Sequence, residues 1–140
     1  MYHEVTVRHR QTMTDGQEKT VTSKILVSDA QLFAEAEYAA MAWAQDHEAD
    51  VTAIRRSRIR EFANDPDAGS KIYMLTLQST FTDEGTGKQR HMRYAAALYA
   101  DDLAQAKSEA ETFIRQGYDG IDIIGINETA FRAVAETSNA

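Results

Sequence analysis

The chain has 140 residues, a formal net charge of −7 and no cysteine. Its length suits a single domain, and the missing cysteine excludes disulfides, thiolate zinc sites and cysteine nucleophiles. Acidic and basic residues are spread evenly along the chain, so we expect no broad positive surface for duplex nucleic acid.

The first half of the chain predicts a hairpin, a helix and a third strand. Residues 5–10 alternate as in a β-strand, residues 14–17 give a turn signal, and residues 21–27 form a second β-branched run. Ser28 and Gln31 have the spacing of a capping box, which predicts a helix over about 29–47. Its buried stripe would contain Phe33, Ala36, Ala40 and Trp43.

The third strand is expected over 51–60, after which the same order of elements returns. Strands are predicted over 72–81 and 91–99, joined by a longer turn. A helix follows to about residue 116, with Asp101 or Asp102 as its N-cap and Gly117 as its C-cap. A closing strand is expected over 121–126.

This order predicts two diverged β-β-α-β repeats, at 2–62 and 71–134. A linker at 63–70 holds the only proline, and a frayed tail is expected at 135–140. We expect an α+β fold in which both repeats share one core within a single domain, 1–140. The sheet should be mixed and mostly antiparallel, with two helices on one face.

Several segments resemble an uncharacterised family of small bacterial, prophage and phage proteins, known only as a domain of unknown function. They are residues 51–56 with Glu61 and Phe62, the strand at 73–81 with its turn at 83–88, and residues 126–129. The resemblance extends from residue 2 to about 134. It implies a phage or prophage setting, but no activity and no catalytic residues.

No motif predicts catalysis or a cofactor. Residues 85–88 (Gly-Thr-Gly-Lys) lack the first glycine and the following helix of a phosphate-binding loop, so a hairpin turn is expected. The four histidines do not have the spacing of zinc ligands. Phe33 and Trp43 could line an aromatic pocket, although their helical spacing favours a core position. We therefore expect no enzyme, no metal and no cofactor.

Arginine is the residue type with the least ordinary distribution. Arg8 and Arg10 share a face of the first strand, while Arg55, Arg56, Arg58 and Arg60 follow the core of the third. If these strands are neighbours, the guanidinium groups converge, and Arg90 or Arg93 could join from the second repeat. Arginine binds phosphate in a bidentate manner, and Tyr94 or Tyr99 could stack on a base. The alternative is that these arginines pair with acidic residues.

The first functional hypothesis is a non-enzymatic phage or prophage binding protein. It would sequester a small nucleotide, such as a host-defence signal, on the arginine surface. The alternative is a protein-interaction or assembly module that has no small ligand, with a host or phage protein as partner. A third option, single-stranded nucleic acid binding, fits poorly with the negative charge.

Location and assembly are the remaining expectations. The N-terminus has no leader pattern and no segment reaches the roughly 18 apolar residues of a membrane span, so a cytoplasmic location without membrane contact is expected. Unpaired hairpin edges favour association of like chains, which predicts a homodimer.

Overall fold

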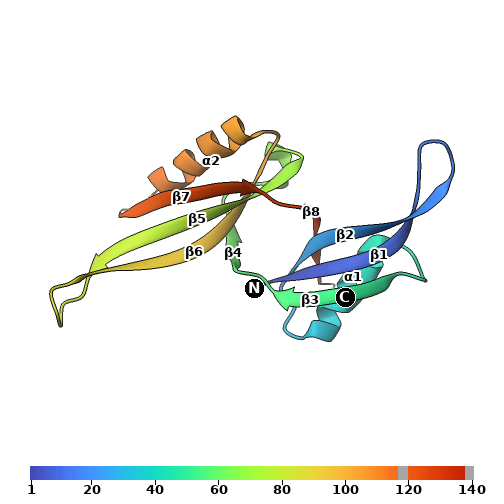
Figure 1. Cartoon of the computed structure of the whole chain (residues 1–140), viewed down its shortest axis with the longest axis horizontal. Coiled ribbons are helices and arrows are strands. Elements are labelled where there is room, and N and C mark those ends of the chain that lie inside the picture. Colours follow the sequence, from blue (N-terminus) through green and yellow to red (C-terminus); the bar gives the residue numbers. More distant parts are fainter. Residues whose placement is uncertain (117–119, 138–140) are drawn as a thin grey trace. The chain divides into compact units, whose positions relative to one another are not determined.

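The structure is a computed structural model that describes residues 1–116 and 120–137 (Figure 1). Its helices are α1 (Phe33–Ala44), α2 (Leu103–Arg115) and a short 3-10 turn, η1 (Pro66–Ala68). Neither α-helix is long and apolar enough to cross a membrane. The strands are β1 (Tyr2–Thr12), β2 (Glu18–Ser28), β3 (Asp50–Arg56), β4 (Ile59–Phe62), β5 (Lys71–Thr82), β6 (Gln89–Ala100), β7 (Ile121–Glu128) and β8 (Phe131–Glu136).

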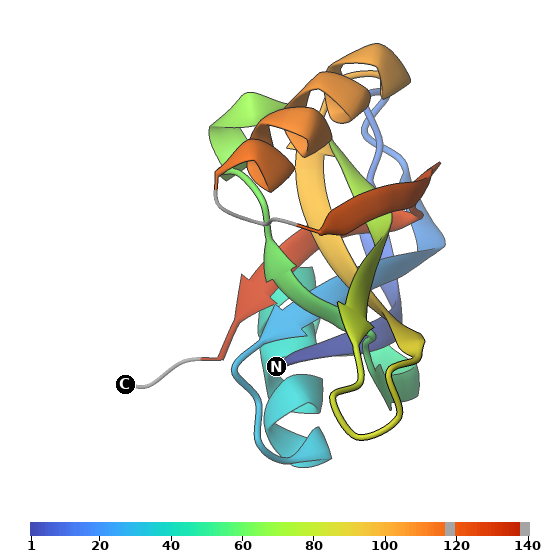
Figure 2. The ribbon, with the colours of Figure 1, turned by 90° about the vertical axis from the view of Figure 1, so that its left-hand side faces the viewer.

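The chain divides into two compact units, each built on a sheet of four strands. Unit 1 comprises Met1–Ser57 with Ala130–Ala140, and unit 2 comprises Arg58–Thr129. The strand orders are β3-β1-β2-β8 and β4-β6-β5-β7, so each sheet is mixed. The α+β class and the two β-β-α-β repeats are confirmed. The strands form two sheets where one was expected, and each sheet carries one helix (Figures 1 and 2).

Each unit has its own hydrophobic cluster because each repeat supplies both an apolar sheet face and a helix to cover it. In unit 1, alternate residues of β1 face α1, and Val5 and Val7 are fully buried. In unit 2, Leu75 and Leu77 of β5 pack in the same way beneath α2. The expectation of one core shared by both repeats is therefore wrong.

The two helices begin differently. Asp102 caps α2 as expected, since its carboxylate accepts the Gln105 N–H at 2.8 Å. The capping box expected for α1 is absent because Ser28 still belongs to β2, and α1 begins only after Leu32. Phe33 consequently lies at the helix start and is half exposed, whereas Ala36 and Ala40 are buried as predicted. The C-cap expected at Gly117 lies outside the described residues.

The strand expected over 51–60 is two strands. β3 ends at Arg56 in unit 1, and β4 begins at Ile59 in unit 2, where it pairs in parallel with β6. The far end of the chain does the reverse. β8 returns to unit 1 and pairs in parallel with β2, so Ala135 and Glu136 are strand residues where a frayed tail was expected.

The linker expected at 63–70 is largely tied to unit 2. The Asn64 side chain accepts the Tyr99 N–H at 2.7 Å and donates to the Tyr99 carbonyl at 2.8 Å. The Ser70 N–H donates to Asp101 Oδ1 at 2.8 Å. This segment is therefore held against the end of β6 in unit 2. The single-domain organisation of the chain stays a prediction.

Candidate ligand-binding site

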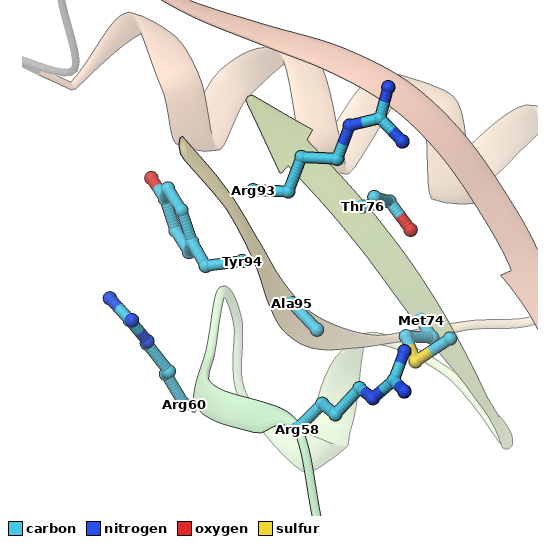
Figure 3. Close-up of a pocket in the computed structure, with 7 residues that line it drawn as sticks. All are labelled: Arg58, Arg60, Met74, Thr76, Arg93, Tyr94 and Ala95. Carbon is cyan, nitrogen blue, oxygen red and sulfur yellow. The ribbon is translucent and has the colours of Figure 1, made fainter. Parts of the chain in front are cut away.

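The sheet of unit 2 has a hollow whose lining includes three arginines. This arginine hollow has a volume of about 430 Å³. Figure 3 shows the side chains that line it: Arg58, Arg60, Met74, Thr76, Arg93, Tyr94 and Ala95. They come from β4 and the residue before it, from β5 and from β6, so the site lies wholly within one unit.

Strand alternation places most of the floor on the side of the sheet away from α2. Met74 and Thr76 alternate along β5 with Leu75 and Leu77, which belong to the cluster under α2. Ala95 opposes Thr76 across the β5–β6 pair and is almost fully buried. The floor is thus small, and two of its three residues are apolar.

The three arginines of the hollow have no acidic partner within the described part of the chain. None of them forms a salt bridge with a carboxylate among residues 1–116 and 120–137. Arg93 Nε donates to the Gln78 amide oxygen at 3.2 Å, which leaves its charge uncompensated. The Arg60 guanidinium carbon lies 5.3 Å from the centre of the Tyr94 ring, a cation–π distance. In Figure 3 the Arg58 guanidinium lies beside Met74.

The matching face of unit 1 is also hollowed, with about 310 Å³, but its charges are mixed. Its lining consists of Glu4, Thr6, Lys24, Ala53, Ile54 and Arg55. Glu4 Oε1 accepts from Arg55 Nε at 3.0 Å and from Arg55 Nη2 at 2.9 Å. This hollow therefore neutralises its own arginine.

The expected convergence of first-repeat arginines on one surface is wrong. β1 and β3 are neighbours as supposed, but their antiparallel register sets Arg8 opposite Asp50 and Arg55 opposite Glu4. Arg8 pairs with Asp50 at 3.2 Å, while Arg55 pairs with Glu4 at the other end of the strands. The alternative interpretation, pairing with acidic residues, describes these arginines.

Arg10 has the most extensive acidic surroundings. Its Nη2 lies 3.0 Å from Asp46 Oδ1, and its backbone N–H donates to Asp46 Oδ2 at 2.8 Å. Hydrogen bonds from Arg10, and then from the Glu48 N–H, hold the pKa of Asp46 well below its ordinary value. The same pairing raises the pKa of Arg10. Asp46 is therefore occupied as an ion-pair partner, and no group of acidic or histidine residues in the described chain could hold a metal ion.

The other predicted binding residues are divided between several places. Arg58, Arg93 and Tyr94 meet in the arginine hollow. Arg56 lines a separate hollow of unit 1, beside Asp29 and Gln31. Tyr99 lies outside the arginine hollow and stacks on Phe62, with ring centres 5.0 Å apart.

The binding hypothesis omitted four residues of the hollow: Arg60, Met74, Thr76 and Ala95. Arg60 belongs to the run of arginines after the third predicted strand, which is expected from the sequence to converge with Arg8 and Arg10, although it is not among the predicted ligand-binding residues. The other three carry no signal in the sequence, because a methionine, a threonine and an alanine within strands are typical of ordinary sheet positions.

Residues 85–88 form the turn between β5 and β6, as the sequence indicated. The Asp83 N–H donates to the Lys88 carbonyl at 2.8 Å, and Gly87 has a φ of 70°. A strand follows this turn, so it provides no helix N-terminus for phosphate.

Comparison with known proteins identifies the family. The family model described as "Domain of unknown function (DUF4494)" matches residues 1–137, so the chain belongs to this family. No curated protein and no solved structure matches the chain.

Proposed function

We propose that this member of the DUF4494 family is a binding protein that holds a small nucleotide in the arginine hollow. The observation that carries the proposal is the set of three arginines without a carboxylate partner in the described chain, around a floor of Met74, Thr76 and Ala95. Uncompensated guanidinium groups in one concave site favour an anion as the missing partner.

The shapes of the side chains fit a nucleotide better than a simple anion. Guanidinium groups present planar forks of donors that match phosphate oxygens. The volume of about 430 Å³ lies within the usual range for small-molecule sites. The Arg60–Tyr94 pair could stack on a base at the edge of the hollow, because Tyr94 packs against the cluster beneath α2, on the other side of β6 from Arg93. Met74 and Ala95 would exclude water beneath the ligand.

The lining also favours binding without chemistry. Among the described residues it contains no histidine and no carboxylate, so none of the usual general bases faces the ligand. Thr76 is the only aliphatic hydroxyl among these lining residues. We therefore infer a non-enzymatic role in which the protein sequesters its ligand. The resemblance to phage and prophage proteins supports a cytoplasmic setting in which that ligand is a nucleotide signal of host defence.

The test is isothermal titration of the protein with mono-, di- and cyclic nucleotides. At least one class should bind, and Arg58→Ala or Arg93→Ala should each weaken binding about tenfold or more, since charged hydrogen bonds contribute roughly 1.5–3 kcal/mol. Arg90→Ala is the matched control, because Arg90 lies on β6 but pairs with Asp83 at 2.8 Å outside the hollow. Absence of binding by every class, or full affinity in both hollow variants, would contradict the proposal.

A second candidate, an assembly module, is favoured by the outer face of α1. Tyr38 is 72% exposed on this face, and shallow hollows lie on both sides of it, lined in part by Met41 and Ala42 on one side and by Ala34 on the other. The corresponding positions of α2 are mostly polar. A projecting side chain between two hollows is complementary to a second copy of itself, and an antiparallel pair would bring Glu35 near His47 of the other copy.

This candidate predicts a homodimer formed through α1. Light scattering should give the mass of a dimer for the wild type and of a monomer for Tyr38→Lys. Lys107→Glu, on the polar outer face of α2, is the control and should leave the dimer intact. A wild-type monomer at all concentrations, or a dimer of the Tyr38→Lys variant, would contradict it.

A further inference from the structure

The floor of the arginine hollow extends along the face of β5 and β6 that lies away from α2. Met74, Thr76 and Gln78 are alternate residues of β5 on this face. Across the β5–β6 pair, Thr76 opposes Ala95 and Gln78 opposes Arg93, in a continuous register. At a rise of about 3.4 Å per residue, Met74 and Gln78 lie about 14 Å apart along the strand. The face therefore has two ends, with Thr76 and Ala95 between them.

Arg93 is held at the Gln78 end of this face. The two residues are directly opposed, so their side chains leave the sheet on the same side. Arg93 Nε donates to the Gln78 amide oxygen at 3.2 Å, which fixes the position of the guanidinium. The Nη groups of Arg93 have no acceptor among the described residues. They are free to donate to an anion at this end of the hollow.

Arg58 supplies the cation at the Met74 end. It enters the hollow from the residue before β4. Figure 3 shows its guanidinium beside Met74 and that of Arg93 on the other side of Thr76. Within the described part of the chain, the Arg58 guanidinium forms no hydrogen bond and no salt bridge. The hollow therefore presents two cations at separate ends, each without a carboxylate partner in the described chain.

The middle of the hollow suits a sugar better than a phosphate. Thr76 and Ala95 have small side chains, and no cation stands between them in the β5–β6 register. Thr76 Oγ1 forms no hydrogen bond with the residues that the structure describes, so it can bond to a sugar hydroxyl. The Arg60–Tyr94 pair at the edge of the hollow would then receive the base.

We propose that the arginine hollow selects nucleotides whose two phosphates lie on opposite sides of a sugar over nucleotides whose phosphates are joined directly. A nucleoside 3′,5′-bisphosphate and a dinucleotide both have the selected arrangement. The inference rests on the proposed function, which it deepens by naming the spacing of the phosphates. Two separated cations can each bind a phosphate of such a ligand, whereas a pyrophosphate group reaches only one end of the hollow.

The first experiment compares two isomers that contain the same atoms and the same base. Adenosine 3′,5′-bisphosphate carries a phosphate on each side of its ribose, whereas ADP carries both at one position. Titration calorimetry of the wild type should show the 3′,5′ isomer binding about tenfold more tightly or better, because it makes a second charged contact. Equal affinities would overturn the inference while the proposed function stands.

Two variants separate the spacing of the phosphates from their total charge. Arg58→Ala and Arg93→Ala should each abolish the preference for the 3′,5′ isomer, because each leaves one end of the hollow without a cation. Arg90→Ala is the matched control and should keep the preference, since Arg90 pairs with Asp83 outside the hollow. A preference that survives in either hollow variant would overturn the inference, because it would then come from the greater charge of the 3′,5′ isomer alone.

Probes without a base distinguish failure of this inference from failure of the proposed function. Propane-1,3-diol bisphosphate separates its phosphates by three carbons, as the 3′,5′ isomer does, and pyrophosphate joins them directly. If no nucleotide binds but the bisphosphate binds more tightly than pyrophosphate, the spacing is supported and the nucleotide ligand fails. Absence of binding by all four probes would overturn both. Given the isomer preference, tighter binding of a 5′-phosphorylated diadenylate would identify a dinucleotide as the ligand, and weaker binding a mononucleotide.

Discussion

The sheet faces that no helix covers have the same strand arrangement in both units, but they differ in whether their arginines pair with carboxylates. Thr6 opposes Lys24 in unit 1, and Thr76 opposes Ala95 at the matching place in unit 2. Two residues before each threonine stand Glu4 and Met74. In unit 1 the glutamate neutralises Arg55, whereas in unit 2 no carboxylate of the described residues pairs with an arginine of the hollow. The two repeats thus differ in that the arginine of the unit 1 hollow is paired with an acid, whereas the three arginines of the unit 2 hollow are not.

The largest effect should follow from giving unit 2 the acid of unit 1. Met74→Glu places a carboxylate beside Arg58, as Glu4 lies beside Arg55. We expect nucleotide affinity to fall about 100-fold, since an internal carboxylate competes for the guanidinium and repels phosphate, a loss of roughly 2.7 kcal/mol. Titration calorimetry measures it, with Met74→Gln as the control of equal size. Similar affinities in the two variants would show that the charge balance of this face does not govern binding.

The next largest effect should come from removing the acidic partner of Arg10 in unit 1. Asp46→Asn removes the charged acceptor of Arg10, and thermal unfolding should show a fall of several degrees in Tm. Asp50→Asn is the control, because the Asp50 side chain is 61% exposed in its pair with Arg8. An equal change in both variants would mean that the enclosed position of Asp46 adds nothing.

The same pair has a defined pH dependence. The pKa of Asp46 is lowered in the folded state, so its contribution is present above its ordinary value of 3.8 and is lost as the pH falls toward the lower, folded value. Acid unfolding of the wild type should therefore be steeper below pH 3.8 than that of Asp46→Asn.

Local pattern was enough to predict most of the fold. Alternation in β1 and β5 and the Asp102 cap of α2 depend on neighbours in sequence, and each was identified. The sequence does not predict that β4 joins the second sheet and β8 the first. Residues 51–60 form an uninterrupted strand pattern, and the choice of partner strand depends on contacts with residues that are distant in the sequence.

The same limit explains the candidate site. The sequence identifies the arginines of the first repeat as candidate binding residues, but the strand register determines which of them pair with acidic residues. Arg55 and Arg58 are three residues apart, yet one pairs with Glu4 in unit 1 and the other enters the hollow of unit 2. Between them the chain passes from one sheet to the other, and no sequence feature of residues 55–58 signals this passage.

A smaller effect is expected at His3, a buried polar side chain whose counterpart in unit 2 is a tyrosine. His3 is fully buried beside Phe33, and neither ring nitrogen has a hydrogen-bond partner within the described structure. Its counterpart in register is Tyr73 of the second sheet. Burial, and then the charge of Arg56, lower the pKa of His3 below 6.5. We expect His3→Leu to stabilise the protein by about 1 kcal/mol.

The pH dependence at His3 has the opposite cause from that at Asp46 but the same sign. The unfolded chain binds more protons than the folded one below pH 6.5, so wild-type stability should fall as the pH drops through that value, by up to about 1.4 kcal/mol per pH unit. Urea unfolding at several pH values should show this slope reduced in His3→Leu. His47→Gln, at an exposed position of the same unit, should retain it. Parallel slopes in the wild type and His3→Leu would contradict the assignment.

The smallest effect should follow from Glu4→Met, which gives unit 1 the residue that unit 2 has at this place. The partner, Arg55, is 72% exposed, and an ion pair with so exposed a member contributes at most about 1 kcal/mol, so the free energy of unfolding should change by less than that. The variant should still bind only one nucleotide, because the hollow of unit 1 contains one guanidinium, that of Arg55, besides the ammonium of Lys24, whereas the hollow of unit 2 contains three guanidinium groups. Calorimetric stoichiometry tests this, with Arg55→Ala in the Glu4→Met background as the control. A second binding site that Arg55→Ala removes would show that one uncompensated arginine on this scaffold is sufficient, and that the number of arginines in unit 2 is not what distinguishes the two sheets.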